Sequence, residues 1–151
     1  MAFAYKQVSV SDLPILKQLL AVFGEAFAEP ATYQGAVPTD GYLKALLGKS
    51  HFIALAAIDR QDVVGGLVAY ELEKFEQARS EIYIYDLAVR EGHRRQGAAT
   101  GLIHELQRIA KERGAYVIFV QADVGDEPAI RLYESLGTRQ DVYHFDIPPE
   151  K

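Results

Sequence analysis

The feature that most constrains the fold is a change of hydrophobic period between residues 81 and 122. Residues 81–89 form a nearly continuous apolar run typical of a strand, and residues 116–122 form a second one. Between them, apolar residues recur at helical spacing from Ala99 to Ala110, and Gly114 is placed to end that helix. A strand, a helix and a strand joined by short connections predict a βαβ unit with parallel strands.

The rest of the sequence predicts antiparallel strands and further helices around this unit. Two apolar runs flank the polar turn at residues 60–62, so a hairpin and then a three-strand meander precede the βαβ unit. Helices begin near the cap residues Ser11 and Asp126, and Gly137 ends the second. The predicted fold is α+β, a single domain over residues 1–151 with one mixed central sheet and flanking helices. The other expected elements are a first strand at 5–10, a loop at 29–40, a short helix at 42–47, strands at 51–59 and 63–72, and a last strand at 142–147.

The composition excludes several kinds of chemistry. The 151 residues include no cysteine, so a thiol nucleophile, a disulfide and a thiolate metal site are excluded, and no metal is expected. A transferred group is then expected to pass directly between two substrates. The N-terminus lacks a secretory apolar region, and no apolar stretch reaches the roughly 18 residues of a membrane span, which predicts a cytoplasmic protein without a membrane partner. A formal charge of −5 opposes nucleic-acid binding and favours cationic partners.

A glycine-containing turn joins the strand at 81–89 to the following helix. The first N–H groups of a helix lack intrahelical partners and lie at the positive end of its dipole, so they can bind phosphate. Gly97 allows close approach of the backbone, and Arg94 and Arg95 supply positive charge. The alternative to a phosphate site is that Gly97 only allows the backbone conformation of the turn and the two arginines are exposed to solvent. The position of the turn inside the βαβ unit favours the phosphate site.

The segment Arg94-x-x-Gly97-x-Ala99 resembles the Arg/Gln-x-x-Gly-x-Gly/Ala motif of GNAT acetyltransferases, the acyl-CoA N-acyltransferase superfamily. The resemblance implies acetyl-CoA as co-substrate and a sheet whose fourth and fifth strands splay apart. The backbone of the turn would bind pyrophosphate, and the edge of the preceding strand would pair with the pantetheine arm. The coenzyme-binding residues expected on this basis are Leu87, Ala88, Val89, Arg94, Arg95, Gln96, Gly97, Ala98, Ala99, Thr100 and Ala129.

Asp86 is the candidate general base because it interrupts an apolar strand, where an unpartnered carboxylate is costly. Strand alternation places it on the face of Ile82 and Ile84, unless a bulge shifts it. A carboxylate beside the reacting amine could hold it and accept its proton. The alternative is a structural aspartate paired with an arginine. The backbone N–H of Leu87 or of its neighbour on the strand is the expected oxyanion donor.

Tyr133 is the candidate general acid. Its helix resembles the GNAT pattern in which a tyrosine before a glycine-ended turn protonates the departing sulfur. The alternative is a packing residue, since Tyr133 also has helical spacing with Ala129 and Leu136. Many GNAT members have Asn near the start of this helix, whereas Asp126 and Glu127 stand here.

A wider resemblance, to the type I aminoglycoside 3-N-acetyltransferases that modify gentamicin, covers most of the chain after the first helix. It implies transfer to the 3-amino group of the 2-deoxystreptamine ring, antibiotic resistance and a homodimer. The segments that resemble this family are residues 52–57, 74–77, 79–89, 116–123 and 144–147.

The distribution of acidic residues also favours a polycationic sugar as the acceptor substrate. Several carboxylates on segments expected to converge beside the strand at 116–122 could bind several ammonium groups. The alternative is a solvated acidic face, with Asp126 capping a helix. The expected substrate residues are Asp86, Asp123, Asp126, Glu127 and Asp146, with Glu29, Tyr33 and Phe75 at the rim of the cleft.

Two other functions remain open. The same machinery would serve an acetyltransferase for a polyamine or another small amine. A non-catalytic acyl-CoA-binding domain would keep the phosphate turn, although Asp86 and Tyr133 argue against it.

Overall fold

The computed structural model describes residues 3–150. The chain forms two compact units, Met1–Gln121 and Ala122–Lys151. No helix in the described part of the chain is both long enough and apolar enough to cross a lipid bilayer.

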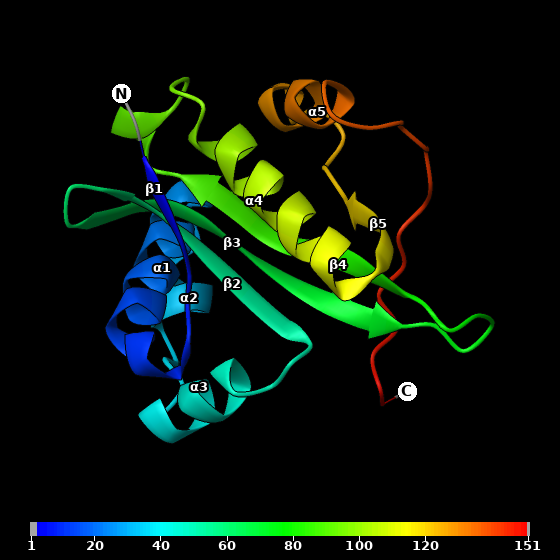
Figure 1. Ribbon diagram of the computed structural model, residues 1–151. Coiled ribbons are helices and arrows are strands. Elements are labelled where there is room, and N and C mark those ends of the chain that lie inside the picture. The colour runs from blue at the N-terminus through cyan, green and yellow to red at the C-terminus, as the bar shows by residue number, and fades with distance from the viewer. Residues whose placement is uncertain (1–2, 151) are drawn as a thin grey trace. The chain divides into compact units, whose positions relative to one another are not determined.

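The first unit is built on a five-stranded sheet with the order β1-β2-β3-β4-β5 (Figure 1). Its strands are β1 (Ala4–Gln7), β2 (Phe52–Asp59), β3 (Asp62–Glu73), β4 (Ser80–Val89) and β5 (Ala115–Val120). The first four pair antiparallel, and β4 pairs parallel with β5. The chain between β4 and β5 forms helix α4 (Ala98–Arg113), which Gly114 ends at φ +76. The predicted mixed sheet and its βαβ unit are therefore confirmed.

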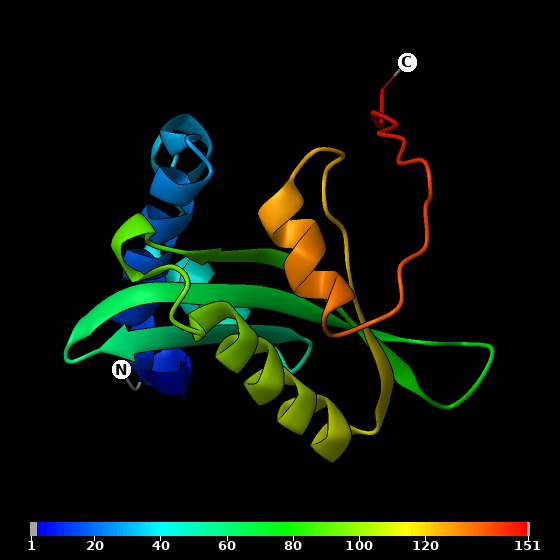
Figure 2. The ribbon, with the colours of Figure 1, turned by 90° about the horizontal axis from the view of Figure 1, so that it is seen from above.

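Helices cover both faces of this sheet (Figure 2). The short helix η1 (Val10–Asp12) leads into α1 (Leu13–Ala26), which lies with α2 (Pro30–Gln34) and α3 (Asp40–Leu47) on the face opposite α4. The apolar side of α1 meets the sheet closely at Gly66. A Cβ there would overlap Leu19 and lie 2.5 Å from the carbonyl oxygen of Leu55. Helix α2 was not predicted, because its five residues were assigned to a loop.

The second unit contains helix α5 (Glu127–Glu134), capped by the Asp126 side chain. The strand predicted at residues 142–147 is wrong, since this segment has no regular secondary structure. Its apolar residues alternate as in a strand, yet Tyr143 and Ile147 are 92% and 86% exposed. A strand needs a neighbour for its backbone hydrogen bonds, and the described part of the chain supplies none to this segment.

Candidate active site

A β-bulge sets the direction of Asp86. Val68 pairs with Asp86 and Ala69 pairs with Ile84, so Tyr85 is an extra residue on β4. The bulge reverses the alternation of side chains beyond it. Asp86 therefore faces α1 together with its partner Val68, and the expected shared face with Ile82 and Ile84 is wrong.

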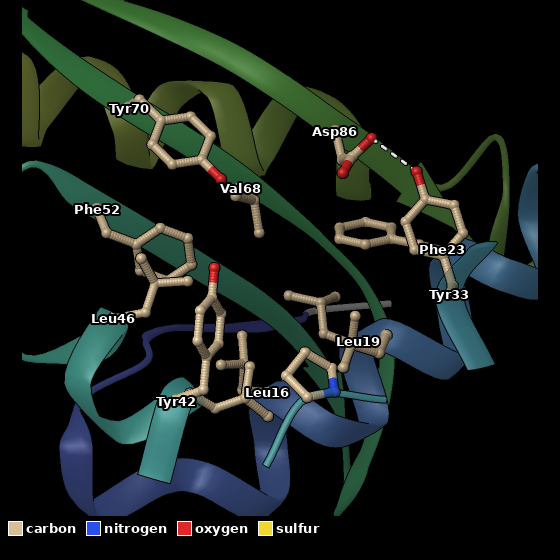
Figure 3. Close-up of a pocket in the computed structure, with 13 residues that line it drawn as sticks. Leu16, Leu19, Phe23, Tyr33, Tyr42, Leu46, Phe52, Val68, Tyr70 and Asp86 are labelled. Atoms are coloured by element: carbon tan, nitrogen blue, oxygen red, sulfur yellow. Dashed lines mark hydrogen bonds between the residues drawn. The ribbon is translucent and has the colours of Figure 1, made fainter. Parts of the chain in front are cut away.

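Tyr33 contacts this carboxylate directly (Figure 3). Its hydroxyl donates a hydrogen bond of 3.0 Å to Asp86 Oδ1. The Tyr33 ring packs against Phe23 and Phe27, with ring centroids 6.0 and 5.7 Å apart. The short helix α2 thus carries the phenol to the bulged strand, and two residues expected at the site lie together.

The surroundings of Asp86 raise its affinity for a proton above that of a free carboxylate. Burial raises the pKa of the Asp86 carboxyl, and the negative charge of Glu29 raises it further, whereas the hydrogen bond from Tyr33 lowers it. Burial and the charge of Asp86 also raise the pKa of Tyr33, so its hydroxyl stays protonated as a donor. A base is most effective when its pKa lies near the working pH, so the upward shift suits Asp86 to that role.

Replacing Tyr33 with Phe should move the pH profile of any reaction that uses Asp86 as a base. The change removes the hydrogen bond that lowers the pKa of Asp86, so that pKa rises further. Activity is present above this pKa and is lost as the pH falls through it, so the acidic limb of kcat/KM should shift to higher pH. The limb should stay in place in Tyr116→Phe, which alters a phenol that is 48% exposed on β5 and lies outside the cavity lining. An unshifted limb in Tyr33→Phe would separate Tyr33 from the chemistry.

A cavity of about 180 Å³ lies beside Asp86, between α1, α3 and strands β2 to β4. Among the described residues of its lining, Asp86 is the one that carries a charge, and the others are aliphatic, aromatic or proline. Sequence reasoning missed the aromatic residues Tyr42, Phe52 and Tyr70. The pairing of Phe52 with Tyr70 had no usable signal in the sequence, because a bulge between Ala57 and Ile58 shifts the register of β2 and β3.

The turn between β4 and α4 leads into a helix whose first N–H groups have no intrahelical partner. Arg95 and Gly97 have φ values of +63 and +87, and no side chain caps the helix. The first helical hydrogen bond runs from Gly101 N to Gly97 O, so the N–H groups of Ala98, Ala99 and Thr100 precede it. A Cβ at Gly97 would meet no atom within 4 Å, so the space over the turn is open. These features fit an anion such as a pyrophosphate.

The neighbouring coenzyme candidates lie at the end of β4, beyond its pairing with β5. The pairing of β4 with β5 ends at Ile84 and Val120, whereas Leu87, Ala88 and Val89 continue β4 beside β3 alone. The Nε of Arg94 donates to the Val89 carbonyl at 2.9 Å, which ties the turn to the end of the strand. Arg95 and Gln96 are exposed.

Phe75 lies at the opposite end of β4 from Asp86. It is fully exposed on the β3–β4 connection, next to the pairing of Glu73 with Ser80. Six residues of strand separate Ser80 from Asp86, or roughly 20 Å. Phe75 does not line the cavity.

The remaining candidates belong to the second unit. Burial raises the pKa of Tyr133 to about 12, and the charge of Asp126 contributes to the rise. Asp126 Oδ1 accepts from Ala129 N at 3.4 Å, as expected of a helix cap. The Nε2 of His144 lies 2.7 Å from Asp146, and Asp123 and Glu127 are exposed.

The sequence profile of the acetyltransferase (GNAT) family matches residues 17–138. The chain belongs to this family. Its mixed sheet with flanking helices is the GNAT fold, and GNAT acetyltransferases use acetyl-CoA. The open turn that begins α4 fits the pyrophosphate of that co-substrate.

Solved structures extend the comparison for this GNAT acetyltransferase. An aminoglycoside acetyltransferase from an uncultured soil metagenomic sample has 55% identity and a TM-score of 0.96, over 98% of this chain and 99% of the other. A second one, also from an uncultured soil metagenomic sample and solved with sisomicin, has 30% identity and a TM-score of 0.91, over 98% and 97%. The same protein solved with trehalose has 31% identity and a TM-score of 0.91, over 98% and 97%. No curated protein matches the chain.

Proposed function

We propose that this GNAT acetyltransferase transfers the acetyl group of acetyl-CoA directly to an amine of an aminoglycoside antibiotic and so confers resistance. The 3-amino group of the 2-deoxystreptamine ring in gentamicin-like drugs is the proposed acceptor. The observation that carries the proposal is 55% identity to an aminoglycoside acetyltransferase over nearly the whole chain.

Asp86 holds the ammonium group of the substrate and accepts its proton, directly or through one water. Its raised pKa and the fixed hydrogen bond from Tyr33 support this role. The N–H of Leu87 stabilises the oxyanion that forms at the acetyl carbonyl. Tyr133 protonates the departing thiolate, and its pKa of about 12 keeps the proton available until then.

The coenzyme binds along β4 and over the start of α4. Ala98, Ala99 and Thr100 donate backbone N–H groups to its pyrophosphate, with Arg95 and Gln96 on the same turn. The backbone of Leu87 to Val89 pairs with the pantetheine arm. Acetyl-CoA supplies the activated acetyl group as a thioester.

The two units belong to one catalytic domain in this proposal. Asp123, Asp126, Glu127 and Asp146 bind further ammonium groups of the drug, in line with the charge of −5. Ala129 at the start of α5 is also assigned to coenzyme binding.

The functional form is a cytoplasmic homodimer in this proposal. Residues 142–147 support it, because an alternating apolar segment with exposed Tyr143 and Phe145 is suited to pairing with a second copy. Light scattering after size-exclusion chromatography would measure the mass of the assembly.

Tyr133→Phe should lower kcat about tenfold and leave the affinity for coenzyme A unchanged. The effect is smaller than the ~10²–10⁴-fold usual for acid–base groups, because a thiolate is a stable leaving group. Steady-state kinetics with gentamicin would measure it. A wild-type kcat in Tyr133→Phe would assign the residue to packing.

A thiol-release assay with acetyl-CoA tests the proposal. The acceptors are gentamicin, sisomicin, kanamycin, spermidine and a peptide amine. Preferential turnover of gentamicin and sisomicin supports the proposal. Turnover of spermidine or the peptide alone would assign the enzyme to another amine, and coenzyme A binding without any turnover would indicate a binding domain.

A further inference from the structure

The cavity beside Asp86 is suited to a different kind of acceptor from a polycationic drug. We infer that this enzyme also acetylates primary amines that carry a single apolar ring, with the ring inside the cavity and the amine at Asp86. The inference rests on the proposed role of Asp86 in receiving the amine.

The cavity has room for one ring of a ligand. An apolar cavity of about 150 Å³ holds one benzene molecule. The volume here is about 180 Å³, enough for one six-membered ring with a short link to an amine. The several linked rings of an aminoglycoside cannot enter it together.

The lining selects an apolar ring. Nine of the thirteen lining residues are aliphatic, phenylalanine or proline, three are tyrosines, and one is Asp86. Hydroxyl groups of a sugar would lose their hydrogen bonds to water against such walls, and burying a polar group without a partner is costly. The rings of Phe52 and Tyr70, with centroids 5.7 Å apart, offer faces and edges to an aromatic ligand instead.

The negatively charged carboxylate of Asp86 lies at one end of the cavity (Figure 3). Asp86 and Tyr33 lie at that end, and Leu46, Phe52 and Tyr42 lie at the other. Tyr33 bonds Oδ1, and among residues 3–150 no other side chain forms a hydrogen bond with this carboxylate, so Oδ2 can accept from an ammonium group. Tyr42 lines the cavity and is 62% exposed, so a ligand can enter beside it.

The transfer balances without any further reactant. The bound ammonium gives one proton to Asp86, and the neutral nitrogen then bonds to the acetyl carbonyl carbon as the carbon–sulfur bond breaks. The nitrogen loses its second proton, and the departing thiolate gains one. The products are an amide, free coenzyme A and one proton, which Asp86 releases to water.

Binding of phenylethylamine and glucosamine, measured by ligand-detected NMR without acetyl-CoA, tests the inference. Each has one ring and one primary amine, but only glucosamine carries hydroxyls. Phenylethylamine should bind at least tenfold more tightly, and it should be acetylated when acetyl-CoA is added. Equal affinities, or no binding of phenylethylamine, would overturn the inference.

Leu46→Trp fills the cavity and should weaken phenylethylamine at least tenfold. The matched control is Leu72→Trp on β3, where the side chain is 40% exposed and outside the cavity. Unchanged affinity in folded Leu46→Trp would contradict the inference. If that variant does not fold, phenylethylamine is titrated into the wild-type protein and the backbone amide chemical shifts are followed by NMR. Shift changes at Val68 and Tyr70 support the site, and changes only elsewhere overturn it.

The outcomes separate this inference from the proposed function. Gentamicin turnover without phenylethylamine binding overturns the inference and leaves the proposed function standing. Phenylethylamine acetylation without gentamicin turnover supports the inference and overturns the proposed function.

Discussion

Asp86→Asn should lower kcat/KM for gentamicin by ~10²–10⁴-fold, the usual contribution of a positioned acid or base. The amide keeps the size of the side chain and can still contact Tyr33, but it cannot take a proton from an ammonium group. The phosphate-binding turn between β4 and α4 does not include Asp86, so the affinity for coenzyme A should stay within about a factor of two of wild type. Steady-state kinetics and calorimetry measure the two quantities.

Asp62→Asn is the matched control for this substitution. Asp62 is exposed at the start of β3 and does not line the cavity, so the same chemical change should leave kcat/KM unaltered. A wild-type rate in Asp86→Asn would remove Asp86 from the mechanism. A loss of coenzyme A binding equal to the loss of turnover would assign Asp86 to the fold instead.

Gly97→Val should weaken coenzyme A roughly 10- to 100-fold. Gly97 has φ +87, which a β-branched residue adopts only at a cost of about 1–3 kcal/mol, and each 1.4 kcal/mol is about tenfold in affinity. The added side chain would also stand in the open space over the N–H groups of Ala98 and Ala99. Isothermal titration of coenzyme A measures the change.

Gly92→Val supplies the comparison, because it adds the same side chain on the same connection. A Cβ at Gly92 meets no atom within 4 Å, and Gly92 is not among the glycines with positive φ. Coenzyme A should bind this variant as it binds wild type. Equal affinities in the two variants would place the pyrophosphate away from Gly97.

Periodicity was sufficient to predict the sheet because burial on each face repeats over many residues. The βαβ unit from Ser80 to Val120 followed from the same pattern, since short connections allow few arrangements. The turn at Gly97 could be predicted as well, because its residues are contiguous in the sequence. The coenzyme and acid–base roles that were assigned to these residues stay predictions.

The direction of Asp86 could not be predicted from alternation. One extra residue, Tyr85, reverses the face of the strand beyond it, and a bulge has no fixed sequence signature. The hydrogen bond between Tyr33 and Asp86 joins residues 53 positions apart and depends on the short helix α2, whose pattern is too brief to recognise. The segment at 142–147 has the alternation of a strand, but pattern alone supplies no pairing partner.

Analysis of the product formed from sisomicin tests the central claim most directly. Protein, acetyl-CoA and sisomicin are incubated, and the drug is examined by mass spectrometry and then by two-dimensional NMR. The account predicts one acetyl group on the drug, bound to the 3-amino nitrogen, and none with Asp86→Asn in the same time. Sisomicin that remains unmodified while acetyl-CoA is bound would contradict it.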